Sequence, residues 1–246
     1  MNILSNTDYI GKAFKQFGRD AGAYIGLMLL TALLYFIFSL ITGWGSLLST
    51  LVCGPMLAGI FIFIRSSEAD ERPDFSRFFG VFSNRYYLAF LAQNIFVGLL
   101  TILAISALFV LFLGSHSEEI ISALTQMQSG EERDVKLGIE LLIGIGVNFI
   151  LAVSIGFVVS FIISTLYFFA PLFVIYHDLS FWPAMEASRR MVYTRFWKIA
   201  GFVGLLALLN IAGTILCCIG LLVTIPVTYI AMYNAFMDQT SSESTL

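Results

Sequence analysis

The residues best suited to chemistry stand between positions 171 and 198, in the string PLFVIYHDLSFWPAMEASRRMVYTRFWK. His177 and Asp178 are adjacent there, and a histidine beside a carboxylate is a pair that general acid–base catalysis uses. The same pair also suits a structural task, the capping of a helix end at a membrane surface. The second histidine, His116, is distant in the sequence. We therefore expect the structural role and predict that the protein is not an enzyme.

Other catalytic and metal-binding patterns are missing from the sequence. It has no H-x-x-x-H, C-x-x-C, P-loop or G-x-S-x-G motif. Cys217 and Cys218 are adjacent, so a disulfide between them would be strained. No other type of metal ligand stands near them. We expect neither a metal nor a cofactor.

The composition indicates an integral membrane protein. Of 246 residues, 59% are hydrophobic and 12% are charged, against roughly 25% charged in soluble domains. The net charge of −3 argues against a nucleic-acid-binding surface. A span needs about 20 apolar residues, and the apolar runs fit an all-α transmembrane bundle with spans at 23–42, 47–64, 87–113, 146–171, 196–216 and 219–237.

Three amphipathic segments precede pairs of these spans, at 7–20, from Phe75, and at 181–194. Basic and aromatic amphipathic helices lie in the membrane interface, and we expect all three on the cytoplasmic side. The alternative for the first is packing on a neighbouring protein surface. Residues three and four apart share a helical face, which gives these expected apolar faces: Ile10, Ala13, Phe14 and Phe17 in the first, Phe75, Phe78, Phe79 and Phe82 in the second, and Phe181, Met185 and Val192 in the third.

The basic residues set the expected orientation. Of 13 lysines and arginines, all but Arg133 and Lys136 fall on one side of a six-span arrangement. The positive-inside rule makes that side cytoplasmic, with both termini there and a bacterial inner membrane as the location. The segment 138–176 could hold one kinked span or two, but two would move 189–198 to the other side. We therefore expect one, with an interfacial start near Glu140.

The remaining segments follow from the same arrangement. The polar stretch 114–137 is expected as an extracytoplasmic loop, and 238–246 as a disordered cytoplasmic tail. Pro55, Pro171 and Pro226 are expected to kink the helices that contain them. An interfacial helix, a span and a proline-containing span then recur three times, which suggests a threefold parallel internal repeat. The alternative is that unrelated helical hairpins look alike.

The string FAPLFVIYHDLSFWPAMEASRRMVYTRFWKIAGF, followed by CCIGLLVTIPVTYIAMYNAF, resembles YciC-type bacterial inner-membrane proteins. It also looks like the membrane domain of some glycerophosphoryl diester phosphodiesterases. The shared features are an Ala-Pro end of a span, Asp178, the pair Ser188-Arg189, and Phe196-Trp197. The resemblance implies a polytopic helical fold. These families have no agreed molecular function, so it implies no activity.

Two functions remain open from the sequence. The first is a non-enzymatic module that engages anionic lipids or partner membrane proteins, because basic residues near a membrane surface attract anionic headgroups. The second is a transporter or channel for a neutral or amphiphilic molecule, with Asn94, Asn148 or Asn210 along its path; such amides also serve as hydrogen bonds between helices. The expected headgroup contacts are Lys12, Lys15, Arg19, Arg77, Arg85, Arg189, Arg190, Arg195 and Lys198.

Overall fold

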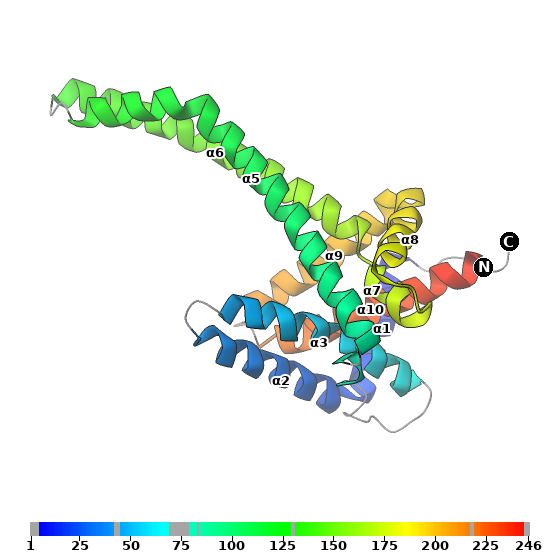
Figure 1. Cartoon of the computed structure of the whole chain (residues 1–246). Helices are drawn as coiled ribbons and strands as arrows, with labels where there is room; N and C mark the ends of the chain where they lie inside the picture. The colour runs from blue at the N-terminus through cyan, green and yellow to red at the C-terminus, as the bar shows by residue number, and fades with distance from the viewer. Residues whose placement is uncertain are drawn as a thin grey trace. The chain divides into compact units, whose positions relative to one another are not determined.

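The computed structural model describes residues 5–41, 45–68, 79–82, 84–128, 131–216 and 219–243, and they are all-helical (Figure 1). The chain divides into two units, residues 1–95 with 165–246, and residues 96–164. The elements are α1 (Asn6–Arg19), α2 (Ala21–Ser39), α3 (Gly45–Glu68), η1 (Phe79–Phe82), α5 (Asn84–Gln128), α6 (Glu132–Leu166), α7 (Ala170–Tyr176), α8 (Phe181–Thr194), α9 (Phe196–Ile215) and α10 (Leu221–Glu243).

Within the described part of the chain, five helical segments are long and apolar enough to cross a membrane, which indicates a multi-pass membrane protein. α3 has 24 residues, but several of its side chains lie outside the described part of the chain. The five segments are Ala21–Ser39, Tyr86–Gln128, Glu132–Tyr176, Phe196–Ile215 and Leu221–Ser241.

The core of the first unit is aromatic and forms where helix ends meet. The Tyr24 ring, near the start of α2, packs edge-on against Phe63, near the end of α3, with ring centroids 5.2 Å apart. α2 and α3 therefore run antiparallel. The Tyr176 hydroxyl donates to the carbonyl of Phe61 at 3.1 Å, and Phe236 of α10 packs edge-on against Phe173 at 4.9 Å. α7 is thereby fixed against both α3 and α10.

The helix α1 exists as expected, but its buried face differs from the expected one. A capping box starts it, in which Ser5 and Asp8 satisfy each other's backbone N–H groups. Tyr9, Ala13 and Phe17 are buried, whereas Phe14 is 42% exposed. The spacing rule grouped Phe14 with the apolar residues but left out Tyr9, whose hydroxyl finds a partner on α10. The alternative interpretation, packing against protein, therefore accounts for the buried face.

The segment 114–137, expected as an extracytoplasmic loop, is largely helical among its described residues. α5 continues to Gln128 and α6 begins at Glu132, and among the described residues only Glu131 of this stretch lies outside a helix. A Cβ atom on Gly138 would lie 2.7 Å from Cγ of Met127, so the two helices touch near their junction. Glu, Gln, Lys, Leu and Met are all strong helix formers. Polarity there indicates water around the helices, not an irregular chain.

The expected disorder at 238–246 is also wrong as far as Glu243, because α10 continues to that residue. Asp238 accepts a hydrogen bond from the Tyr9 hydroxyl, and the side chain of Gln239 is buried. A polar sequence at a chain end is typical of disorder, but here a hydrogen bond from α1 fixes Asp238. Residues 244–246 lie outside the described part of the chain.

The segment 138–176 is one helical run with a break, not a helix bent at Pro171. α6 ends at Leu166, a turn covers 167–169, and α7 begins at Ala170 with the proline in its first turn. Proline is tolerated in a first turn because its missing N–H would have no partner there. Pro55 and Pro226, by contrast, lie inside α3 and α10 as expected.

Candidate membrane-surface site

The helix α8 has the expected bounds, and one side of it packs against protein. Ala184, Met185, Met191 and Val192 are buried. The buried Ser188 hydroxyl donates to the Leu166 carbonyl at 2.9 Å and accepts from the Phe169 N–H at 3.2 Å. These are backbone groups that the break between α6 and α7 leaves without helical partners. Ser188 therefore fixes α8 to that break.

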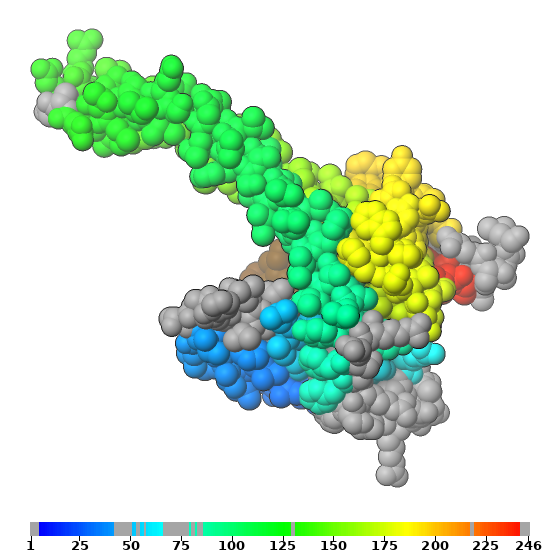
Figure 2. Space-filling view, viewed as in Figure 1, coloured from blue at the N-terminus to red at the C-terminus, as the bar shows by residue number. Residues whose placement is uncertain are grey.

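The opposite side of α8 carries residues at positions i, i+4, i+7, i+8 and i+11. We call this set the α8 outer face: Trp182, Glu186, Arg189, Arg190 and Tyr193. Trp182 is 62% exposed and Tyr193 is 75% exposed, one near each end of the helix (α8 is yellow in Figure 2). Just beyond, Trp197 is 85% exposed. Exposed Trp and Tyr are typical of a membrane–water interface.

Glu186 balances part of the charge on this face. Arg189 donates to both of its carboxylate oxygens at 2.8 Å, and Nε of Arg190 donates to Oε1 at 2.8 Å. The hydrogen bonds from Arg189, and then those from Arg190, lower the pKa of Glu186 to about 2. Glu186 and Arg190 are four residues apart, the spacing at which oppositely charged side chains meet on one helical face. Two guanidinium groups share one carboxylate, so the three side chains keep a single net positive charge.

The N-terminal basic residues lie on α1, which contacts α10 through polar side chains. Lys12, Lys15 and Arg19 are exposed. On the other side of α1, Nδ2 of Asn234 donates to Oε1 of Gln16 at 2.7 Å, and the Tyr9 hydroxyl donates to Asp238. Burial and the Asp238 hydrogen bond raise the pKa of Tyr9. Both contacts fix α1 against α10, so Lys12, Lys15 and Arg19 have a defined position on the protein surface.

The other predicted headgroup contacts have different positions. Lys198 is exposed and its carbonyl accepts from Nδ2 of Asn6 at 3.2 Å, whereas Arg195 is half-buried at the junction of α8 and α9. Arg77, the first residues of the segment expected from Phe75, and the side chain of Arg85 lie outside the described part of the chain. Arg65, which was not among the predicted contacts, lies over the Tyr176 ring at 5.3 Å. Sequence reasoning also missed Trp182 and Tyr193, which their spacing from Glu186 and Arg190 could have revealed.

His177 and Asp178 form the turn between α7 and α8. His177 is the C-cap residue of α7, and Asp178 has φ 54°, a left-handed conformation that Asp tolerates better than most residues. The Tyr86 hydroxyl donates to Oδ1 of Asp178 at 3.3 Å beside a cavity of about 380 Å³. The left-handed turn suits Asp178, and the His177 ring packs against the Phe173 and Phe236 rings. Among the described residues, no group of three His, Cys, Asp or Glu side chains could hold a metal ion.

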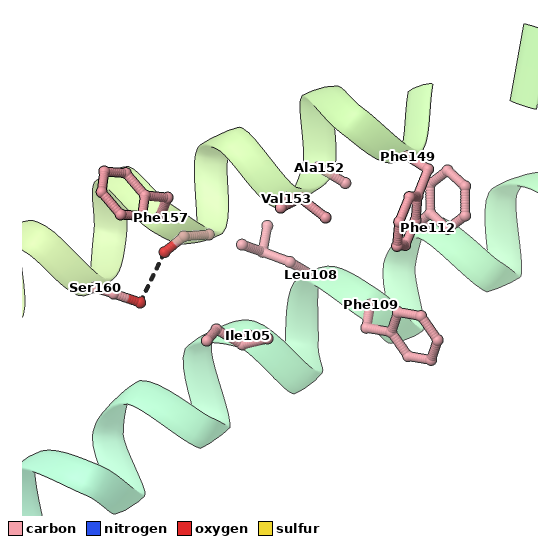
Figure 3. A pocket seen from close by; sticks show the side chains of 10 residues that line it. Ile105, Leu108, Phe109, Phe112, Phe149, Ala152, Val153, Phe157 and Ser160 are labelled. Atoms are coloured by element: carbon pink, nitrogen blue, oxygen red, sulfur yellow. Dashed lines mark hydrogen bonds between the residues drawn. The ribbon is translucent and has the colours of Figure 1, made fainter. Parts of the chain in front are cut away.

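The second unit holds an apolar cavity of about 260 Å³ between α5 and α6 (Figure 3). Leu108 lies between the two helices, and Ser160, the polar side chain in the lining, donates to the Gly156 carbonyl at 2.8 Å. The lining residues are Ile105, Leu108, Phe109, Phe112, Phe149, Ala152, Val153, Gly156, Phe157 and Ser160.

The amide side chains within apolar runs mostly bond to other helices. Nδ2 of Asn210 donates to Oγ1 of Thr228 at 2.9 Å, between α9 and α10. Nδ2 of Asn148 donates to Nε2 of His116 at 2.9 Å, between α6 and α5. Asn94 instead donates to the Phe90 carbonyl of its own helix. These contacts match the role of amides as links between helices.

Comparison with known proteins adds no family. No protein-family model, no curated protein and no solved structure matches the chain.

Proposed function

We propose that the chain is a six-span protein of a bacterial inner membrane, with α3 as a span beside the five apolar segments and with both termini cytoplasmic. Contacts between helix ends support this count. Because Tyr24 meets Phe63, α2 and α3 cross in opposite directions. Because Tyr86 meets Asp178, the chain must return to the same membrane surface between them. Two membrane crossings, one by α5 and one by α6, bring the chain back to that surface. A third crossing would place Tyr86 and Asp178 on opposite sides of the membrane.

The terminal helices support the same arrangement. Asn6 bonds to the carbonyl of Lys198 at the start of α9, and Tyr9 bonds to Asp238 near the end of α10. The N-terminal helix, the start of α9 and the end of α10 therefore share one surface. Lys12, Lys15 and Arg19 belong to that surface, which the positive-inside rule makes cytoplasmic.

At this surface the protein acts as a non-enzymatic module that engages anionic lipids. The observation that carries this proposal is that exposed aromatic side chains lie beside basic ones. Trp182 and Tyr193 flank Arg190 on the α8 outer face, and Trp197 stands next to Lys198. Aromatic rings at headgroup depth anchor a helix, and each basic residue near the surface adds about 1 kcal/mol of attraction to anionic lipid. The site is therefore a surface for headgroups, not an enclosed pocket.

The test uses Trp182 and Trp197 as sensors in a Trp44→Phe background. Brominated phosphatidylglycerol and brominated phosphatidylcholine are compared as quenchers of tryptophan fluorescence in reconstituted vesicles. We expect stronger quenching by the anionic lipid, and a loss of this preference when Arg189, Arg190 and Arg195 are all replaced by Gln. Added salt should weaken the preference, because it screens exposed charges.

The matched control is Arg133→Gln with Lys136→Gln, which removes basic residues from the second unit. It should leave the preference unchanged. A further variant has the opposite sign: Glu186→Gln frees one positive charge and should strengthen the preference. Equal quenching by both lipids in the unmodified protein would overturn the lipid-binding function.

The threefold repeat is part of the same proposal. α1 precedes α2 and α3, which contains Pro55, and α8 precedes α9 and α10, which contains Pro226. The middle copy would begin at Phe75, outside the described residues. The resemblance to YciC-type proteins fits this plan and remains a prediction, as does the cytoplasmic position of the interfacial helices.

The alternative, a transporter for a neutral or amphiphilic molecule, needs a polar path. The cavity that Phe149 helps to line, next to Asn148 in the sequence, has apolar side chains apart from Ser160. Asn210 is bonded to Thr228. These observations favour the lipid-engaging module.

A further inference from the structure

The cavity between α5 and α6 has two chemically different ends. At one end the Ser160 hydroxyl donates to the Gly156 carbonyl of its own helix. At the other, Phe112 and Phe149 pack edge-on with ring centroids 5.5 Å apart (Figure 3). Beyond this aromatic pair the His116 ring stacks on Phe112 at 4.7 Å. An apolar groove therefore leads toward a polar pair, His116 and Asn148.

The polar pair presents a hydrogen-bond donor. When Nδ2 of Asn148 donates to Nε2 of His116, the histidine hydrogen must be on Nδ1. From Nδ1 that hydrogen can reach the Phe112 carbonyl at 3.0 Å. An amide nitrogen carries two hydrogens, so the second hydrogen of Asn148 can serve a ligand. The group that fits beside it is an acceptor, and a carboxylate is the strongest acceptor of this kind.

The size of the groove selects a single chain. Its volume of about 260 Å³ is below the roughly 300–1,000 Å³ usual for ligand pockets, so it has room for one acyl chain and not for two side by side. Phe109, Val153 and Phe157 on its rim are exposed. An acyl chain can therefore enter from the side.

We propose that this groove binds a long-chain fatty acid, with the chain along α5 and α6 and the carboxylate at Asn148 and His116. The site rests on the proposed membrane location of the apolar parts of α5 and α6. There the polar pair lies just past the apolar run 87–113, at the depth where a carboxylate meets water while its chain stays in the bilayer.

The experiment uses the full chain in nanodiscs with a fatty acid that carries a photoactivatable diazirine near its methyl end. Cross-linked peptides are mapped by mass spectrometry. We expect saturable labelling within 105–112 and 149–160, displaced by excess unlabelled fatty acid but not by excess phosphatidylglycerol. Labelling spread over α2, α9 and α10 as well would mean ordinary bilayer contact and would overturn the proposal. Displacement by phosphatidylglycerol would also overturn it.

Two glycines of α6 provide matched variants. Gly156→Leu puts a side chain into the groove, where a Cβ atom would lie 3.6 Å from Leu108. Gly144→Leu makes the same change where no heavy atom lies within 4 Å. Both changes favour the helix, so both variants should fold. We expect at least about tenfold weaker saturable labelling for Gly156→Leu, which is about 1.4 kcal/mol, and no change for Gly144→Leu.

The variant Asn148→Leu tests the polar end separately. It should weaken labelling about tenfold, as expected for one hydrogen bond to a charged group, while a fatty alcohol probe should lose less. Unchanged labelling would contradict the assigned carboxylate site. None of these variants touches α8, so the lipid preference reported by Trp182 and Trp197 should persist. Failure of the groove and failure of the proposed surface function are thus separate results.

Discussion

Individual side chains divide the basic residues into two kinds. Arg189 and Arg190 are bound to Glu186, and Arg65 is held over a tyrosine ring. Lys12, Lys15 and Arg19 are exposed on α1, away from its buried side. A count of basic residues treats all of them alike. The orientation depends on that count, but lipid attraction depends on the charge that remains after pairing.

Glu186 should make stability depend on acid pH. Its folded pKa of about 2 is below the ordinary 4.5, so its contribution is fully present above pH 4.5 and is lost as pH falls through about 2. We expect the melting temperature of the unmodified protein to fall more over this window than that of Glu186→Gln. Circular dichroism in detergent measures both. Identical pH profiles would show that the arginine contacts add nothing to folding.

Ser188 should contribute to the stability of the folded protein. Ser188→Ala leaves the Phe169 N–H, which now donates to this hydroxyl, without that partner. A buried unsatisfied group costs about 1–3 kcal/mol, so thermal unfolding should shift downward. The matched control is Ser180→Ala, because Ser180 is exposed and makes no side-chain cap bond. If both variants melted alike, the link between α8 and the helix break would have no energetic role.

At the scale of elements, the sequence predicts that a helix exists better than it predicts where the helix ends and which helices it packs against. The bounds of α8 were predicted because Phe181 to Thr194 has a clear helical period between a turn and an aromatic pair. The continuation of α5 and α6 through 114–137 was not predicted, because polarity shows where an apolar run ends but not where its helix ends. The face of α1 was misjudged because contact with α10 depends on tertiary structure. The groove at Gly156 also depends on how two distant segments pair.

The α9–α10 hairpin depends on two glycines that touch. A Cβ atom on Gly220 would lie 2.6 Å from the Gly213 carbonyl oxygen, which is backbone and cannot move aside. Gly220→Ala should therefore destabilise the protein by about 1–3 kcal/mol, the usual cost of overpacking. Gly201→Ala is the control, because its nearest neighbour would be 3.7 Å away. Chemical unfolding compares the two, and equal midpoints would contradict the close contact.

At the scale of the whole molecule, the arrangement of the spans depends on which helix ends share a membrane surface. Polar contacts bring together residues far apart in sequence: Asn6 with Lys198, Tyr9 with Asp238, Gln16 with Asn234, and Tyr86 with Asp178. Composition predicted a membrane protein, and charge counting predicted its orientation. Without using charge, the contacts indicate which helix ends share one side of the membrane, because hydrogen-bonded residues cannot lie on opposite sides of a bilayer.

The most direct test labels single cysteines from each side of the membrane. Cys53, Cys217 and Cys218 are replaced by Ser, and Thr125→Cys and Tyr193→Cys are introduced separately at exposed positions. A membrane-impermeant maleimide is then applied to right-side-out and inverted vesicles. We predict that position 125 is labelled only in right-side-out vesicles and position 193 only in inverted ones. Labelling of both positions from the same side would contradict the six-span arrangement.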